Sequence, residues 1–174
     1  MSAFRARLLS LSSLLAVFVL YAGPASAETV TLTCPGTMAV NYSPGMTNTP
    51  RFMTISGTGI FGPCVGLPLG IISADYSGVA QGTTSCLTSS TTANLTLKWN
   101  DGTVSTLVLT QTFNTRPTGQ VVSVYAGTVT AGRFQGATAT ATLTLAQTDL
   151  LGCFTEEGVT ATAGPTILTI VSLL

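Results

Sequence analysis

The 174-residue sequence contains no histidine, and only 7% of its residues are charged. Histidine is the commonest general base and a frequent zinc ligand, so its absence excludes Ser-His-Asp and Cys-His catalysis. A serine–lysine pair would need Lys98, which alternates with Leu97 and Trp99 and belongs to no Ser-x-x-Lys motif. We therefore expect a protein that is not an enzyme and that holds no cofactor and no metal.

The carboxylates leave one remote route to hydrolysis. Asp101 is explained by a turn, whereas Glu156 and Glu157 lie in one loop close in sequence to Asp149. A glycoside hydrolase needs two carboxyl groups about 5–10 Å apart across the sugar. A hydrolase that uses Asp149 with Glu156 or Glu157 is therefore the remote alternative. The same three residues match no calcium-binding loop pattern.

The only long apolar run stands at the N-terminus. Two arginines precede an apolar stretch over residues 8–21, and Ala25-Ser26-Ala27 follows it. This order is typical of a secretory signal peptide, residues 1–27, cleaved after Ala27. No later segment approaches the roughly 20 apolar residues of a membrane-spanning helix. We expect a secreted protein, extracellular or cell-wall associated, in which residues 28–174 form a single disulfide-bonded β domain without membrane contact.

Positive charge is scarce as well. Cleavage removes two of the six Lys and Arg residues and none of the six Asp and Glu residues, so the net charge becomes 4 − 6 = −2. The basic surface that binds nucleic acid is therefore missing. The partners that remain to be weighed are a cell-wall polymer, further copies of the chain and a small apolar ligand.

Helical periodicity is absent beyond about two turns, and alternation of apolar and polar residues replaces it. This pattern predicts an all-β protein. The clearest turn is Asn100-Asp101-Gly102, because these residue types tolerate the positive φ angles of hairpins. The predicted strands cover residues 29–42, 51–61, 69–85, 93–99, 103–113, 120–130, 137–147 and 159–172.

Four cysteines follow the signal peptide, and an even number in an oxidising compartment predicts two disulfides. Short connections favour antiparallel neighbours, so strand direction alternates along the chain. This places Cys34 and Cys64 at one end of the fold and Cys86 and Cys153 at the other. The preferred pairing is Cys34 with Cys64 and Cys86 with Cys153. It depends on residues 69–85 being one strand, because two strands there would reverse every later direction.

About eight antiparallel strands can bury one face each in two packed sheets or in a closed barrel. The expected strand 103–113, which contains "TLVLTQTF", carries Val104 and Val108 on one face and Leu107, Leu109 and Phe113 on the other, as in a strand covered on both sides. We therefore expect an antiparallel immunoglobulin-like β-sandwich, with an up-and-down β-barrel as the alternative. Trp99 is in register with neighbouring leucines and is expected in the core.

Threonine recurs at every second position in several segments, most clearly in "TATATLTL", residues 138–145. Threonine is β-branched, fits a pleated surface and is wetted without charge. We interpret Thr138, Thr140, Thr142 and Thr144 as the solvent face of a strand whose alanines and leucines face the core. A second interpretation is a binding or assembly face, because edge strands that lack lysine are poorly protected against pairing.

Several segments together resemble functionally uncharacterised small secreted β-sandwich proteins of actinobacteria: "YSPGMTNTPR", "LKWNDGTVSTL", "GTVTAGRFQGATATATL" and "TDLLGC". The resemblance covers nearly all of residues 28–174. It implies an exported, disulfide-bonded β domain and transfers no active site. The composition is also similar to neocarzinostatin-like apoproteins, which are secreted sandwiches with two disulfides. Their cysteines close short loops, whereas the spacings here are 64 − 34 = 30 and 153 − 86 = 67.

The sequence thus predicts an exported, non-enzymatic β domain that acts by binding or assembly at or outside the cell surface. The alternative is a carrier of a small apolar ligand, held in a cleft where a few polar groups orient it. Asn41 and Asn94 begin formal glycosylation sequons, whose use depends on the host.

Overall fold

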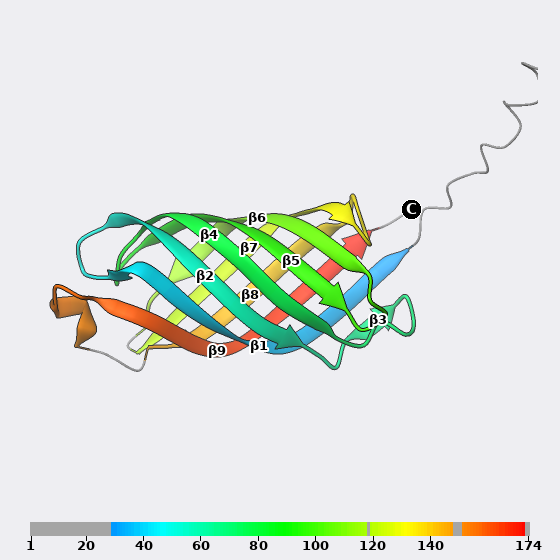
Figure 1. Ribbon diagram of the computed structural model, residues 1–174, viewed down its shortest axis with the longest axis horizontal. Helices are drawn as coiled ribbons and strands as arrows, with labels where there is room; N and C mark the ends of the chain where they lie inside the picture. The colour runs from blue at the N-terminus through cyan, green and yellow to red at the C-terminus, as the bar shows by residue number, and fades with distance from the viewer. Residues whose placement is uncertain (1–28, 118, 148–150, 173–174) are drawn as a thin grey trace, which may run out of the picture.

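The computed structural model describes residues 29–117, 119–147 and 151–172, and strands dominate them (Figure 1). The all-β prediction is confirmed. Residues 1–27, the expected signal peptide, lie outside the described residues. The elements in chain order are β1 (Val30–Met46), β2 (Arg51–Phe61), β3 (Val65–Leu67), β4 (Ala74–Thr84), β5 (Ser89–Trp99), β6 (Val104–Thr115), β7 (Gln120–Gly132), β8 (Thr138–Ala146), the short 3-10 helix η2 (Gly152–Phe154) and β9 (Val159–Ser172).

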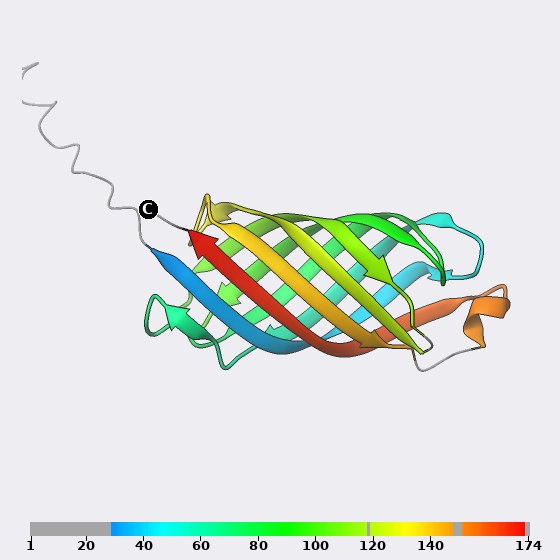
Figure 2. The same cartoon turned by 180° about the vertical axis from the view of Figure 1, so that it is seen from behind.

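The strands form one closed antiparallel barrel. Around the wall the order is β2-β4-β5-β6-β7-β8-β9-β1, and β1 pairs again with β2 to close the circle. Residues 36–43 of β1 pair with residues 54–61 of β2, while residues 30–41 of the same strand pair with β9. Figures 1 and 2 show the tilted strands winding around this barrel. The up-and-down barrel, expected as the alternative, therefore fits, and the immunoglobulin-like sandwich is not confirmed, because β1 leaves no open edge between two sheets.

All eight predicted strands are present, and one short strand was missed. Residues 65–67 form β3, which pairs with Thr31–Thr33 of β1 beyond the β1–β2 ladder. The strand expected over residues 69–85 starts only at Ala74, yet it remains a single strand. The strand directions are therefore the ones from which the positions of the four cysteines were predicted. We call the end with β3 and the start of β1 the β3 end, and the opposite end the η2 end.

Two disulfides are present, as expected. Cys34 is bonded to Cys64 at the β3 end, and Cys86 is bonded to Cys153 at the η2 end. The first bond joins β1 to the segment after β2, and the second joins two loops at the η2 end. Each end of the barrel is thus covalently held by one disulfide.

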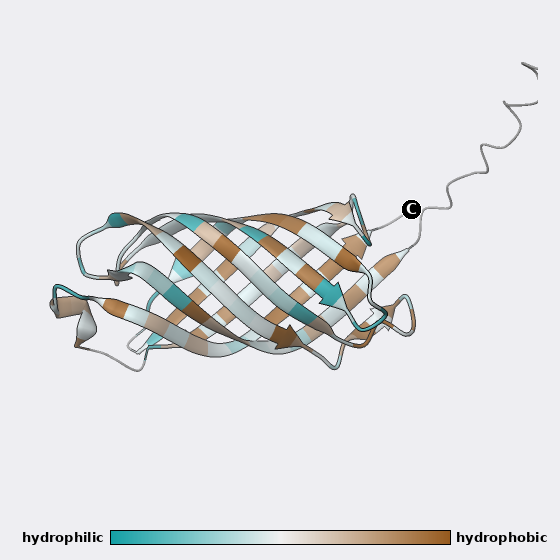
Figure 3. Cartoon of the chain, viewed as in Figure 1, coloured by the Kyte–Doolittle hydropathy of each residue, from teal (hydrophilic) through white to brown (hydrophobic). Residues whose placement is uncertain are grey.

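Hydrophobic and hydrophilic residues alternate along the strands (Figure 3), and this alternation decides which side chains fill the barrel and which face solvent. In β8, Ala139 and Ala141 are buried while Thr138 and Thr140 are exposed, so the solvent-face interpretation of this threonine row is confirmed there. At the β3 end, large buried side chains occupy the interior. Trp99 is 2% exposed, packs edge-on against Phe134 at 5.4 Å between ring centroids, and donates its indole N–H to Ser105 Oγ at 2.8 Å.

Strand β6 departs from the expected two-sided burial. Leu107 and Leu109 face the interior, but Val104 and Val108 lie on the solvent side, 44% and 36% exposed. The expectation that β6 is covered on both sides was wrong, because a barrel wall has only one covered face. Phe113 does not join the leucines either: it is 52% exposed, since the register with β7 shifts between Gln111 and Phe113. That bulge reverses which residues of β6 point inward.

Candidate ligand cavity

The barrel interior contains a cavity of about 70 Å³ between its two packed ends. One cluster of buried side chains fills the β3 end and a second occupies the η2 end; Ile55, Tyr76 and Leu143 pack against both. A single water occupies roughly 30 Å³ of the liquid, so the space exceeds one water molecule. Most of the lining is apolar, and it includes Met38, Val40, Ile55, Leu95, Leu109 and Leu143.

Small residues on facing strands create this space. Gly57, Ala80, Ala93 and Ala141 all line the cavity, and they come from β2, β4, β5 and β8. At the β3 end, inward positions are held by the larger side chains of Trp99, Leu107 and Ile170, which are buried. The cavity therefore lies where these small residues face inward, between the cluster that fills the β3 end and the cluster at the η2 end.

Polar groups lie mainly on the η2 side of the cavity, and most are paired. The Tyr42 and Thr162 hydroxyls are 2.9 Å apart, and the Tyr125 and Thr91 hydroxyls are 2.6 Å apart. In each pair either oxygen can donate. Burial raises the pKa of both tyrosines, and the hydrogen bonds to threonine oppose this shift. Both phenols are thus neutral groups that offer hydrogen bonds to the interior.

A second polar chain runs along β6 and β7. Gln111 Nε2 donates to Ser123 Oγ at 3.0 Å, and Asn114 Nδ2 donates to the same oxygen at 2.7 Å. Tyr76 differs from these residues because its hydroxyl makes no hydrogen bond within the described residues. Burial, with a smaller contribution from Tyr125, raises the pKa of Tyr76 to about 12.

Arg116 is the charged side chain that lines the cavity. It lies just after β6, and the bulge between Gln111 and Phe113 gives Asn114 and Arg116 the inward side. Arg116 Nη2 donates to Thr84 Oγ1 at 3.1 Å, and Nη1 contacts Met46 Sδ at 3.2 Å. Its Nε is buried without a hydrogen-bond partner. Burial lowers the pKa of Arg116, although the neighbouring Tyr42 and Tyr125 oppose the shift.

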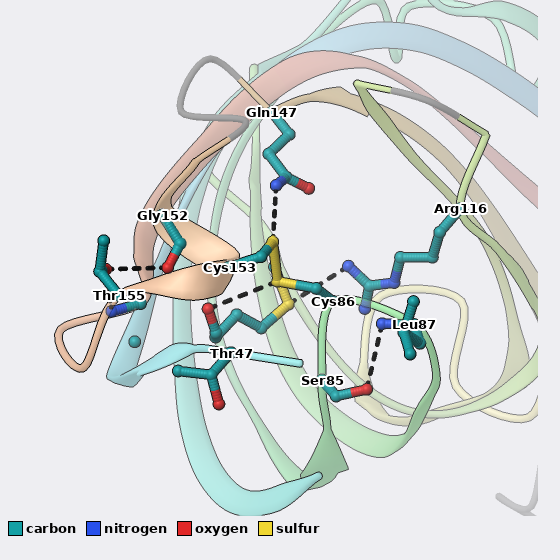
Figure 4. Close-up of a disulfide and its surroundings, with 12 residues drawn as sticks. Thr47, Ser85, Cys86, Leu87, Arg116, Gln147, Gly152, Cys153 and Thr155 are labelled. Carbon is teal, nitrogen blue, oxygen red and sulfur yellow. Dashed lines mark hydrogen bonds between the residues drawn. A yellow bond between two sulfur atoms is a disulfide. The ribbon is translucent and has the colours of Figure 1, made fainter. Parts of the chain in front are cut away.

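Figure 4 shows how this arginine lies relative to the η2 end. The side chain extends from the β6–β7 connection toward the Cys86–Cys153 disulfide, which ties the β4–β5 loop to η2. Gln147 Nε2 lies 3.0 Å from Cys153 Sγ, and the Cys86 backbone N–H donates to the Thr47 carbonyl at 2.7 Å. The loops at this end are thus held together around the arginine.

Among the described residues, no carboxylate forms an ion pair with Arg116. Glu156 and Glu157 are exposed, and no ion pair joins either of them to Arg116. Asp101 lies at the β3 end, where it pairs with Arg133 at 3.1 Å. The remote hydrolase alternative needs Asp149 together with Glu156 or Glu157. Among the described residues, the hollow that Glu156 lines contains no second carboxylate. Asp149 lies outside the described residues.

Metal-ligand clusters are likewise absent from residues 29–117, 119–147 and 151–172. Asn41 and Asn94, which begin the two sequons, face solvent from the middle of the barrel wall. Within the described part of the chain, no helix is long and apolar enough to cross a membrane.

No family model, curated protein or solved structure matches this chain. The interpretation of the cavity as a ligand site is therefore based on its geometry alone. Sequence reasoning missed Arg116, because this residue lies in the connection between the expected strands 103–113 and 120–130. It also missed the interior role of Tyr42, Tyr76 and Tyr125. The scarcity of charge offered a signal for Arg116. In a chain with only six Lys and Arg residues, each cation can be examined individually for a position inside the fold.

Proposed function

We propose that the protein is a non-enzymatic carrier of a small apolar ligand, which it binds inside the barrel. The observation that carries this proposal is the cavity between the two packed ends, lined mainly by apolar side chains with a few polar groups at one side. Ligand sites are typically concave and apolar, with a small number of placed polar groups that orient the ligand. This barrel has both features.

The proposed place of action is outside the cytoplasm, either in the medium or at the cell wall. The two disulfides are consistent with an extracellular protein, since such bonds persist in oxidising compartments. The N-terminal sequence supports export, because it has the order of a secretory signal peptide. Binding at the cell surface remains compatible with the carrier role.

Barrel closure supports interior binding over assembly through strand edges. Each strand of the barrel wall is paired on both sides, so the edges that would recruit another chain are removed. The short strand β3 has only one partner, β1, and contributes three residues. Assembly through the exposed outer wall would need a contact other than strand pairing. The test below distinguishes such an outer-surface role from binding inside the barrel.

The test is calorimetric titration of the folded protein with n-alkanols of increasing chain length. Each methylene buried from water contributes about 0.8 kcal/mol, which corresponds to about fourfold in affinity. We expect affinity to rise by this factor and then to level off when the cavity is full. A variant with Ala141→Leu should bind at least tenfold more weakly, because the added isopropyl group enters the cavity from β8.

The matched control is Ala39→Leu, which makes the same change on the solvent side of β1. It should leave alkanol binding unchanged. Equal loss in both variants, or binding that strengthens without limit as the chain lengthens, would place the alkanols on the outer surface and overturn the proposal. Native mass spectrometry of protein from its host medium adds a direct test, since a carrier should show discrete extra mass on the monomer.

A further inference from the structure

The cavity is lined by a cation for which the described residues supply no carboxylate partner. Arg116 lines the cavity, and no Asp or Glu is among the lining residues. The guanidinium has five N–H donors, yet its described contacts are one threonine hydroxyl and one thioether sulfur, which is a weak acceptor. The buried Nε has no partner among the described residues, as is also the case for the Nε atoms of Arg51 and Arg133.

This arrangement is unfavourable for an unliganded protein. The Arg116 side chain is partly buried, and a partly buried charge without a described counterion loses some hydration and gains little in return. Cations in the interior are ordinarily paired with carboxylates. The terminal nitrogens of the other two arginines meet stronger acceptors, a carboxylate and a backbone carbonyl. Arg133 pairs with Asp101, and Arg51 Nη2 donates to the Gly45 carbonyl. Arg116 is therefore the arginine whose charge is turned toward an apolar space.

The backbone explains why the charge points inward. Without the bulge in β6, strict alternation from Leu107 and Leu109 would place Phe113 in the barrel and Arg116 outside. With the bulge, Phe113 is exposed and Arg116 lies inside, beside Tyr42 and Tyr125. The fold thus exchanges an apolar ring for a cation at the interior, the reverse of what stability alone favours.

We propose that the ligand of this cavity carries a carboxylate, which Arg116 binds while the apolar part lies among the side chains of the barrel. The planar guanidinium matches a carboxylate with two parallel hydrogen bonds, and such charge-assisted bonds are stronger than neutral ones. The Tyr42 and Tyr125 hydroxyls, each bonded to a threonine, flank the same space and can reorient toward the acid. This inference rests on the proposed carrier function and names the chemical class of its ligand.

The test compares octanoate with 1-octanol, which have the same chain length, by calorimetric titration at pH 7. The wild-type protein should bind octanoate at least tenfold more tightly than octanol. Arg116→Gln should abolish this preference while leaving octanol binding in place. The matched control, Arg51→Gln, removes the same charge at the same end outside the cavity lining and should keep the preference.

The failures of the two proposals are distinguishable. If neither compound binds the wild-type protein, the carrier function fails and the acid specificity fails with it. If both bind equally and Arg116→Gln changes neither affinity, the carrier function stands and the assignment to Arg116 is overturned. The same conclusion follows if Arg51→Gln removes the preference as fully as Arg116→Gln.

A second measurement needs no variant and therefore does not depend on the folding of Arg116→Gln. The carboxyl of octanoate labelled with carbon-13 can be titrated by NMR while it is bound to the wild-type protein. Arg116 should hold its pKa below that of free octanoate, because a nearby cation favours the anion. A bound pKa above the free value would show a carboxyl buried without a cation and would overturn the proposal. Tyr42 and Tyr125 do not titrate in this range because their pKa values are raised.

Discussion

The disulfide at the η2 end provides a quantitative test of what stabilises the barrel. Replacing both cysteines, Cys86→Ala with Cys153→Ala, opens a connection between residues 67 positions apart. In the chain-entropy description, a cross-link stabilises the native state by restricting the unfolded chain, and its effect grows with the logarithm of the loop. For this separation the relation gives about 4.4 kcal/mol at 25 °C.

The other disulfide is the internal comparison. Cys34 and Cys64 are 30 positions apart, for which the same relation gives about 3.7 kcal/mol. The two loops do not overlap in sequence, so their effects on the unfolded chain should be close to additive. We therefore expect the variant without the η2-end disulfide to be the less stable of the two by about 0.7 kcal/mol.

The assay is urea unfolding followed by the fluorescence of Trp99, the one tryptophan of the chain, which is 2% exposed in the native barrel. The Cys86→Ala/Cys153→Ala variant should lose about 4 kcal/mol of unfolding free energy. Its m-value should increase, because the unfolded state without the cross-link exposes more surface. A loss below about 1 kcal/mol with an unchanged m-value would refute the entropic reasoning.

Two further predictions concern Tyr76 and the glycines of the wall. Because burial raises the pKa of Tyr76 to about 12 from 10.0, its contribution to stability is complete below pH 10 and falls as the pH rises through the folded pKa. The shift of about two pKa units corresponds to about 3 kcal/mol, and Tyr76→Phe should flatten the loss of stability in urea titrations between pH 10 and 12. Gly127→Ala should clearly lower the thermal midpoint, because its new methyl group would lie 2.0 Å from a backbone carbonyl oxygen of β6. Gly57→Ala should change the thermal midpoint little, because its methyl group meets only the movable end of the Tyr76 side chain. Equal effects of the two glycine substitutions would contradict this reasoning.

Strand positions were readable from the sequence because alternation is a local property. The period of two that places Thr138 and Thr140 outside and Ala139 and Ala141 inside needs no knowledge of distant residues. The same reasoning failed at Phe113. A bulge depends on how β6 meets β7, and nothing in "TLVLTQTF" marks the extra residue.

The candidate site was less accessible to sequence reasoning than the fold. Its apolar lining follows from the inward positions of the strands, but the cavity exists because small residues of four strands meet at one level of the barrel. Arg116 lies between two expected strands, and its inward direction follows from the bulge in β6. The tyrosine–threonine pairs join residues 120 and 34 positions apart, so proximity could not be inferred from spacing.

The sequence by itself determined the β class, the eight main strands, their alternating faces and the ends at which the cysteines lie. These properties follow from side-chain periodicity, turn chemistry and short connections, each of which acts over a few residues. Only the tertiary structure decided that β1 pairs with both β2 and β9, and hence that the sheet closes into a barrel. Closure depends on the tilt and register of all the strands together. The hollow middle of the interior and the cation that faces it are consequences of that global geometry.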